Sequence, residues 1–548
     1  MRSLAAIAVL VPLLASAQEG RFGLTQPPTP GAEVAPVEPE VADGGVEEAD
    51  AGVGTGTPAA SQSPEPVPPP MEESAPPAAE DVPPRQAEAN GYVLGRFSYT
   101  RPRTWGLLPT NEVPTISALL EVNGQVKFTY WRNSKVYGDL SLVGQMGFLY
   151  RTRNADGEVV DAQPKDVASV RPLVSLNELY IHQETIPALT FTVGKKRVTW
   201  SPGLAYSPLD ILNARRDPTD PTAQRAGAWL AQAELSLERF TFDVLFSPAV
   251  TESAFGIPYG FVVYPDWDKK DDQAHYQLVG RAGALLWDTD LNLIVFYGNR
   301  YNDAFERKFR IGGSVSRVFF NTTEVHVELL VQSGSSRLYI NPNCVADALT
   351  ALGCQQNGEA FVDRSLLTDP ALRPTLLAGA RHTFPDDSLL SAEYLFQSDG
   401  YTPAQFQDQI SALDLLQQAA ALGIPANRIP GASEFLGQGS GTDGTPQRFA
   451  FQPIAKHYLF LSYMKSQIFN DFTAQLVTVV NLQDFSTLWT PSIQWAATEW
   501  LQLGLYGFFP LPGPDALAAT VPSTGQRVSE YSLVPMSWRA FFEARVYY

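Results

Sequence analysis

Runs of about ten residues in which apolar and polar side chains alternate recur from residue 91 to the C-terminus. In segment 325–332, for example, valine and leucine occupy every second position, and polar residues such as Glu328 separate them. Successive side chains of a strand point to opposite faces, so each run predicts a strand with one apolar face and one polar face. The final run, 531–548, follows the same rule and ends on an aromatic residue, Tyr548.

The connections between these runs differ in length. Short turns are predicted near 132–135, 184–187, 238–239, 288–290, 321–323, 385–387, 468–471 and 497–499. Longer connections are predicted near 152–167, 199–227, 248–272, 334–372, 399–453 and 511–527, with shorter ones near 301–306 and 482–487. Transmembrane barrels show this asymmetry, because their periplasmic turns are short and their outer loops are long.

The pattern therefore predicts an all-β fold, an antiparallel up-and-down transmembrane β-barrel of about eighteen strands. Its first strand is expected near 91–99, and an even number of strands places both ends of the barrel in the periplasm. A stack of soluble β-sandwich domains is the alternative. It predicts connections of more even length and apolar faces that are buried in a core.

The N-terminal part of the chain predicts export. Residues 1–17 have one basic residue, an apolar stretch and the small-residue site Ala15-Ser16-Ala17, which is typical of a signal peptide. Segment 18–90 is rich in proline and carries 14 acidic and two basic residues, so we expect a disordered periplasmic segment. The barrel is then expected over 91–548.

Charge and the C-terminus narrow the partners and the location. The chain carries a net charge of −19, so nucleic acid is not an expected partner. The aromatic end of the final strand resembles the signal by which barrel-assembly machinery recognises outer-membrane barrels. The predicted location is the cell outer membrane of a Gram-negative bacterium, with membrane lipid as a partner. Oligomeric state is not predicted.

Segment 193–227 departs from the strand pattern, because it combines six basic residues, three acidic residues and several prolines after Gly194. Its order, "VGKKRVTWSPG", "SPLDILN", "RDPTDP" and "RAG", resembles outer-membrane channels of the alginate-export type and related porin-like barrels. The resemblance covers about 177–227. Lys196 and the pair Ser201-Pro202 depart from the motif of that family.

The resemblance implies an eighteen-stranded channel with a constriction lined by arginine and lysine. The residues predicted to form the constriction are Lys195, Lys196, Arg197, Arg215, Arg216, Arg225 and Glu178, the last of which is expected to orient a lysine. Charges on the strands nearly cancel, so a basic constriction predicts a preference for anions. The alternative is an outer loop in which Arg215 and Arg216 pair with neighbouring aspartates.

Two further features lie in the predicted outer loops. Cys344 and Cys354 are expected to form a disulfide, because export favours oxidation and a metal would need more ligands nearby. In the loop 399–453, apolar residues at helical spacing between Thr402 and Gly423 predict an amphipathic helix. It is expected either to pack on the rim or to serve as a lid or plug.

The sequence favours a porin-like channel for the passive diffusion of small hydrophilic solutes, anionic solutes among them. No catalytic residue, metal site or cofactor is predicted, because the five histidines are scattered over separate segments and no nucleophile motif is present. The chain is therefore not expected to be an enzyme. The alternatives are a structural or adhesin-type barrel and a barrel-embedded hydrolase.

Overall fold

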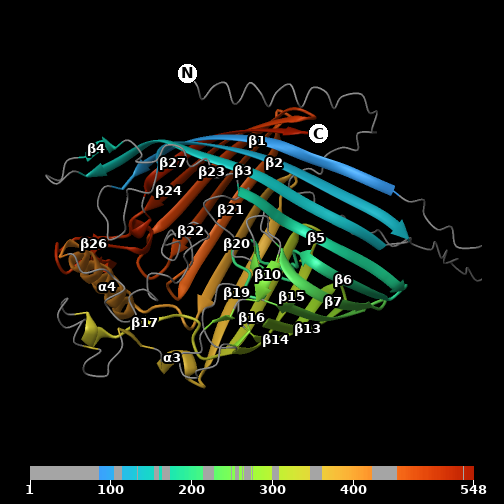
Figure 1. Cartoon of the computed structure of the whole chain (residues 1–548), viewed down its shortest axis with the longest axis horizontal. Helices are drawn as coiled ribbons and strands as arrows, with labels where there is room; N and C mark the ends of the chain where they lie inside the picture. Colours follow the sequence, from blue (N-terminus) through green and yellow to red (C-terminus); the bar gives the residue numbers. More distant parts are fainter. Residues whose placement is uncertain are drawn as a thin grey trace, which may run out of the picture. The chain divides into compact units, whose positions relative to one another are not determined.

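Eighteen strands of the chain pair in an antiparallel ring and so close a β-barrel (Figure 1). The structure is a computed structural model. It describes residues 86–103, 114–131, 134–153, 159–162, 173–213, 227–248, 250–252, 258–261, 263–264, 273–274, 276–298, 308–345, 354, 361–363, 365–422, 453–534 and 536–548.

The barrel strands follow one another in chain order around the wall. The first nine are β1 (Gln86–Pro102), β2 (Pro114–Trp131), β3 (Ser134–Arg153), β5 (Leu173–Ile186), β6 (Leu189–Lys196), β7 (Ala228–Ser236), β8 (Phe240–Pro248), β13 (Tyr276–Leu286) and β14 (Thr289–Gly298). The others are β15 (Lys308–Phe319), β16 (Thr323–Ser333), β19 (Leu372–Thr383), β20 (Ser388–Gln397), β21 (His457–Ile468), β22 (Phe472–Asn481), β23 (Thr487–Thr498), β24 (Leu501–Leu511) and β27 (Met536–Tyr547).

The ring closes where the first strand meets the last. β1 pairs with β27 from Tyr92 opposite Tyr547 to Pro102 opposite Met536. A nineteenth strand of this sheet, β4 (Val159–Ala162), pairs only with the end of β3. Closure leaves no strand edge, which a spanning β-structure requires because lipid cannot satisfy backbone hydrogen bonds. The predicted all-β barrel of about eighteen strands is confirmed.

The alternation of side chains separates two faces of the wall. On β16, the apolar residues Val325, Val327 and Leu329 are 39–43% exposed and face outward. Between them, His326 and Glu328 are buried and face inward. Outward-facing apolar residues are also exposed on most other strands of the barrel. The wall is therefore apolar on its outside and largely polar on its inside, as the sequence pattern predicts.

The short turns carry aromatic residues at one end of the barrel. Trp287, Phe320 and Phe469 are 83%, 91% and 87% exposed and have a positive φ of 51–54°. Two-residue hairpin turns favour positive φ, which non-glycine residues seldom adopt elsewhere. Aromatic residues are enriched where barrels meet the membrane interface, so these side chains mark one boundary of the apolar band.

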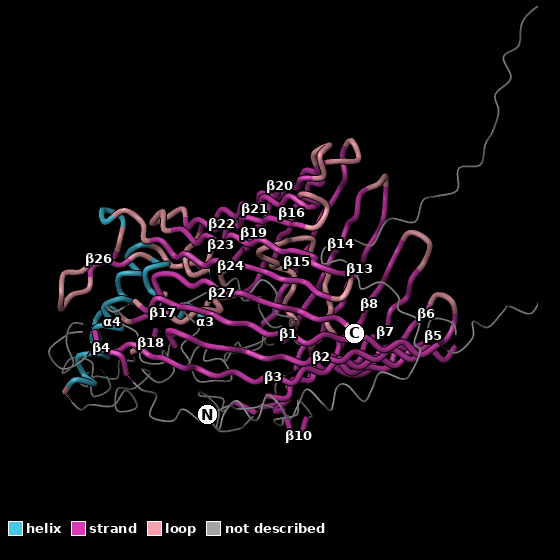
Figure 2. Tube along the Cα trace, turned by 90° about the horizontal axis from the view of Figure 1, so that it is seen from above, coloured by secondary structure: helices cyan, strands magenta, loops and turns pink. Residues whose placement is uncertain are grey.

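The long connections at the other end carry the remaining elements (Figure 2). The short strands are β9 (Val250–Glu252), β10 (Pro258–Phe261), β11 (Val263–Tyr264), β12 (Gln273–Ala274), β17 (Tyr339–Ile340), β18 (Val362–Asp363), β25 (Ala519–Thr520) and β26 (Arg527–Val528). The helices are α3 (Ser365–Thr368), α4 (Pro403–Ala421) and the 3₁₀ turns η1 (Pro342–Cys344), η4 (Asp515–Leu517) and η5 (Glu530–Leu533). Among the described helices, none is both long enough and apolar enough to cross a membrane.

Helix α4 packs in what we call the outer cluster, which consists of α4, α3, η1, β17, β18, β25 and β26 and has Leu533 of η5 in its apolar core. The helix begins at a capping box, in which Thr402 and Gln405 bond to each other's backbone N–H. Ile410 and Leu413 of α4 are buried against Phe361 and the two cysteines. The predicted helix is therefore confirmed, and it packs on the other outer connections.

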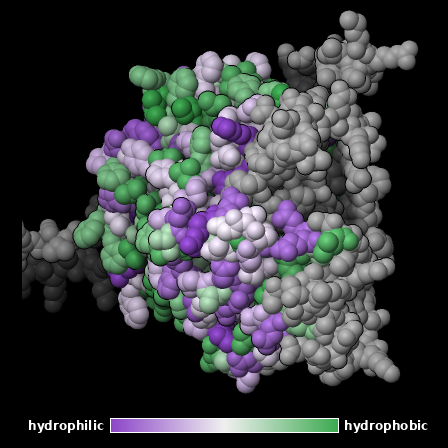
Figure 3. All heavy atoms as spheres, turned by 90° about the vertical axis from the view of Figure 1, so that its left-hand side faces the viewer, coloured by the Kyte–Doolittle hydropathy of each residue, from purple (hydrophilic) through white to green (hydrophobic). Residues whose placement is uncertain are grey.

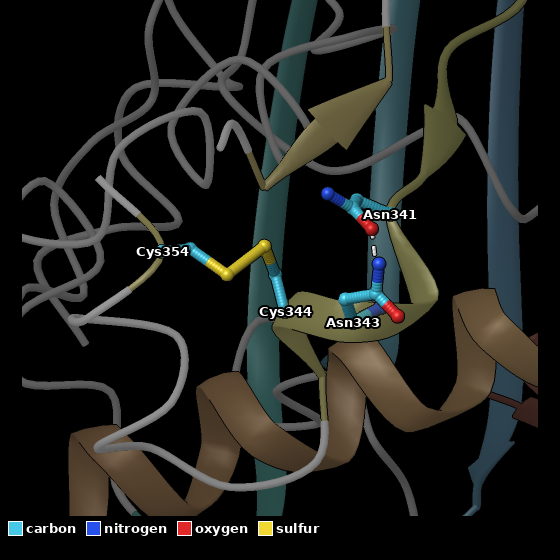
Figure 4. The surroundings of a disulfide bond; sticks show 4 residues. All are labelled: Asn341, Asn343, Cys344 and Cys354. Atoms are coloured by element: carbon cyan, nitrogen blue, oxygen red, sulfur yellow. Dashed lines mark hydrogen bonds between the residues drawn. A yellow bond between two sulfur atoms is a disulfide. The ribbon is translucent and has the colours of Figure 1, made fainter. Parts of the chain in front are cut away.

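Cys344 and Cys354 form a disulfide within the outer cluster, with an S–S distance of 2.04 Å (Figure 4). The adjoining turn η1 is capped by Asn341, whose side chain accepts a hydrogen bond from the backbone N–H of Asn343 at 3.1 Å. The predicted disulfide is confirmed.

Figure 3 views the molecule from the side on which α4 lies, and hydrophilic and hydrophobic residues are mixed there.

The N-terminal boundary of the barrel needs one correction. β1 begins at Gln86, so residues 86–90 are strand, although the sequence assigned them to a disordered segment. They pair in register with 125–129 of β2, because the first hairpin continues beyond the alternation that is visible in β1. The predicted signal peptide 1–17 lies outside the described residues, as does the predicted disordered segment up to residue 85.

Candidate functional site

The connection after β6 turns into the barrel lumen. We call its described part, residues 197–213, the inward segment. Its partners are side chains that face inward from β5, β7, β8, β13, β14, β16, β20 and β21. Asn213, which is 3% exposed, binds the backbone N–H and C=O of Val198 and so holds the two ends of the segment together.

Apolar side chains seat the inward segment on two parts of the wall. Leu209, Ile211 and Leu212, each at most 2% exposed, join one cluster with Leu245 and Phe296. Leu204, Ala205 and Tyr206 pack against a second cluster, formed by inward residues of β19–β24 and by η5. The segment thus has apolar contacts on both sides of the hydrogen bonds described next.

Glu328 of β16 binds the inward segment through both carboxylate oxygens. Its Oε1 accepts hydrogen bonds from Ser201 Oγ at 2.5 Å and from the backbone N–H of Gly203 at 2.9 Å. Its Oε2 accepts from the backbone N–H of Leu209 at 3.4 Å. Glu328 is fully buried, so these donors replace the water that a buried carboxylate would otherwise lack.

Glu393 of β20 binds the same segment at the next two residues. Its Oε1 accepts from the backbone N–H of Leu204 at 2.6 Å, and its Oε2 accepts from that of Ala205 at 3.0 Å. The ring of His326 lies on its other side, with Nε2 at 3.2 Å from Oε1. Two wall carboxylates therefore satisfy four backbone N–H groups of a segment that has no regular secondary structure.

Glycines allow the segment to lie close to the wall. A Cβ on Gly203 would stand 2.6 Å from Leu377 Cδ2 and 3.0 Å from Glu328 Oε1. A Cβ on Gly312 of β15 would stand 2.7 Å from Leu209 Cδ2. The nearest atoms are backbone oxygens, Tyr206 O for Gly203 and Leu329 O for Gly312, so a larger residue would distort the turn of the segment at Gly203 and the β15–β16 pairing at Gly312.

Two of the predicted basic residues end β6. Lys196 lies in the inward register, where it donates to Gln232 Oε1 at 3.4 Å and stands 5.7 Å from the Tyr180 ring centroid. Lys195 follows Gly194, whose φ is 134°, and is 4% exposed, whereas the outward Val193 of the same strand is 60% exposed. The grouping of the two lysines at one constriction stays a prediction.

Glu178 contacts the inward segment through the backbone. Its Oε1 accepts a hydrogen bond from the backbone N–H of Arg197 at 2.8 Å. The predicted role of Glu178 in orienting a lysine stays a prediction. Lys196 and Arg197 thus lie where the segment leaves the wall. Arg215, Arg216 and Arg225 lie outside the described residues, so their part in a constriction stays a prediction.

Arg281 of β13 is held in a fixed orientation next to the segment. Its Nε donates to Asn292 Oδ1 at 2.9 Å, and its Nη1 donates to Asp243 Oδ2 at 3.1 Å. The guanidinium carbon stands 5.7 Å from the ring centroid of Trp200. This arginine and Asp243 are a pair of opposite lumen charges, as the near cancellation of strand charges predicts.

A further buried carboxyl group, that of Glu530, lies next to Tyr206 of the inward segment. Glu530 of η5 accepts hydrogen bonds from Tyr458 Oη at 2.6 Å and from Asn481 Nδ2 at 2.7 Å. Burial, and then the nearby charge of Asp484, raises the pKa of Glu530 to about 8. The ring of Tyr206 in the segment lies tilted by 52° against that of Tyr458, with 5.9 Å between ring centroids, so this network also adjoins the segment.

The residues that hold the inward segment carry little signal in the sequence. Glu328 and Glu393 were expected as ordinary lumen charges, and neither they nor Asn213 and Glu530 carry a local motif. Only their inward register could be predicted. Within the described part of the chain, no group of three or more His, Cys, Asp and Glu side chains is arranged to hold a metal ion.

An apolar belt on the outside, a polar inside and a closed ring of strands occur together in this chain. Lipid solvates such an outer face, and closed barrels of this kind span bacterial outer membranes. The chain is an outer-membrane β-barrel. The predicted location is thereby confirmed.

Comparison with known proteins gives fold neighbours only at low similarity. No family model matches the chain, and no curated protein matches it. Among solved structures, Pseudomonas aeruginosa OccK3 (OpdO) has a TM-score of 0.42 and 6% identity, covering 84% of this chain and 95% of its own. P. aeruginosa OpdK with vanillate has a TM-score of 0.42 and 7% identity, covering 84% of this chain and 98% of its own. Acinetobacter baumannii OccAB3 has a TM-score of 0.40 and 7% identity, covering 84% of this chain and 99% of its own.

Proposed function

We propose that this barrel is a passive channel for small hydrophilic solutes. The observation that carries the proposal is a closed barrel of eighteen strands with polar inward faces and one connection folded inward. Barrels of this strand number are wide enough for an aqueous lumen, and an inward connection narrows such a lumen. The resemblance to alginate-export-type channels stays a prediction, and so does the absence of enzyme activity.

Planar-bilayer recording of the purified, folded protein tests this function. We expect stepwise increases of current in a salt solution, each step the insertion of one channel. A protein that migrates as a folded, heat-modifiable barrel yet gives no current steps would contradict the proposal. A denatured sample serves as the control for detergent artefacts.

We also propose that anionic solutes are preferred. Lys196 faces the lumen, and Arg197 follows it at the start of the inward segment. The oxygens of Glu328 and Glu393 are occupied by backbone N–H groups, so they are poorly placed to bind a passing cation. Charges in a narrow, poorly hydrated gap act with less screening than charges on a wide wall.

Reversal potentials in a salt gradient test this preference. We expect an anion-selective wild type and a shift toward cations in Lys196→Gln. The double variant Arg215→Ala/Arg216→Ala tests the residues outside the described part of the chain. A cation-selective wild type would contradict the preference, while leaving the channel itself intact.

A further inference from the structure

Glu328 and Glu393 are separated from the inward segment by more than a hundred residues of sequence, yet they bind it at consecutive points. Together they accept hydrogen bonds from the backbone N–H groups of Gly203, Leu204, Ala205 and Leu209. Both side chains are at most 1% exposed. A buried carboxylate is costly without partners, so the segment and the two carboxylates stabilise each other only when the segment is in place.

The contacts depend on the path of the backbone and little on the identity of the side chains. Four of the five donors from the segment are backbone N–H groups, and Ser201 supplies the fifth. Carboxylate acceptors suit this task because each oxygen can accept from more than one donor. Such an arrangement fixes where the chain runs, which is what determines the free cross-section beside it.

We propose that Glu328 and Glu393 are positioning residues that hold the inward segment across the lumen and thereby set the conductance of the channel. This inference rests on the proposed channel function. The carboxylates affect conductance indirectly, because a passing solute contacts the inward segment and not the carboxylate oxygens that hold the segment. Their loss leaves backbone N–H groups without acceptors and frees the segment to move.

The test compares single-channel conductance of the wild type with Glu328→Gln/Glu393→Gln. Glutamine keeps the size of the side chain but places an NH₂ group against backbone donors. We expect the conductance to change by about twofold, with added open-channel noise, because the pore cross-section is no longer fixed.

Glu324→Gln is the matched control. It removes one carboxylate from β16, the strand of Glu328, and Glu324 pairs with Arg381 at 3.6 Å and not with the inward segment. We expect its conductance to stay within about a fifth of the wild type.

A second readout does not depend on ion flow. Thr199 is an exposed residue of the inward segment, and both native cysteines are in the disulfide. Thr199→Cys therefore gives one free thiol for a nitroxide spin label. We expect restricted label motion in the wild-type background and in Glu324→Gln, and faster motion in the double glutamine variant.

The outcomes separate the two proposals. A wild type without current steps refutes the channel function, and the spin label then still tests whether the two carboxylates hold the inward segment. If the wild type conducts and the double variant has unchanged conductance and unchanged label motion, the proposed role of the two carboxylates is overturned. If the double variant does not fold, Gly203→Ala replaces it, because a Cβ there would meet Tyr206 O and stand 3.0 Å from Glu328 Oε1, which disturbs the segment at its contact with Glu328 without altering a strand. Unchanged conductance and label motion in folded Gly203→Ala would overturn the proposal equally.

Discussion

The inward segment and the outer cluster are both built from long connections of the barrel, but different interactions hold them. The inward segment has no helix or strand, and buried wall carboxylates bind its backbone. The outer cluster has a helix, a disulfide and an apolar core that includes Phe361, Ile410 and Val528. A connection that crosses a polar lumen needs hydrogen-bond acceptors from the wall, whereas one that lies outside the strands can build a core of its own.

The comparison implies that the two regions can be disturbed separately. Contacts within the outer cluster join its own parts, as when Gln407 of α4 exchanges two hydrogen bonds with Thr520. Contacts of the inward segment join it to the wall and to η5, whose Leu533 is the link to the outer cluster. Variants of the cluster should therefore alter its local stability, and variants of the wall carboxylates should alter conductance.

The largest effect on the outer cluster is expected from Phe361→Ala. Phe361 is 1% exposed in its apolar core, and replacing such a side chain by alanine costs about 3–5 kcal/mol. We expect much faster hydrogen exchange in α4, measured by mass spectrometry, with unchanged single-channel conductance. A conductance change as large as that of the wall variants would show that the two regions are not independent.

Removal of the disulfide is expected to have a smaller effect in the same region. Cys344→Ser/Cys354→Ser opens a short loop, whose closure contributes about 2–3 kcal/mol. Limited proteolysis should cut the outer cluster faster than in the wild type, while the barrel stays heat-modifiable. Recovery of two free thiols from the non-reduced wild type would contradict the disulfide itself.

Glu530 predicts a pH dependence where the two regions approach each other. Its pKa is raised to about 8 by burial and by Asp484, so the folded η5 holds a proton that an opened, solvated η5 releases near pH 4.5. Stability of η5 is therefore greatest at acidic pH, falls as pH rises toward about 8 and then levels off. Between pH 7 and pH 9 the loss is about 1.4 kcal/mol.

Hydrogen exchange of η5, corrected for the intrinsic effect of pH on exchange, measures this loss. Glu530→Gln carries no titrating proton and serves as the control, so its corrected exchange should not change with pH. An equal pH dependence in wild type and Glu530→Gln would rule out Glu530 as the source.

The smallest effect is expected from an epitope insertion that tests how the barrel is oriented in the outer membrane. An epitope inserted between Gly358 and Glu359 lies outside the described residues, within the connection that carries the disulfide. We expect normal folding and antibody binding on intact cells, because long connections face outward in such barrels. Binding only after permeabilisation would reverse the topology.

The wall was predictable from sequence because its information is local. Alternation, as in segment 325–332 with Leu330 as its one exception, gives strand and face together, and Thr402 and Gly423 mark the limits of α4. The inward segment was only partly predictable. Its composition signalled a departure from the strand pattern, but Glu328 carries no sign of its partner Gly203, since that contact depends on the closed barrel. Lys195 and Lys196 were grouped by proximity in sequence, and the inward register of Lys196 follows from the pairing of β6 with β7.

The most direct test of the account records single channels of three proteins under one set of conditions: wild type, Glu328→Gln/Glu393→Gln and Cys344→Ser/Cys354→Ser. The account predicts a conducting wild type, a conductance changed by about twofold in the carboxylate variant and an unchanged conductance in the disulfide variant. Equal conductance in all three folded proteins would contradict the claim that wall carboxylates position the inward segment in the pore.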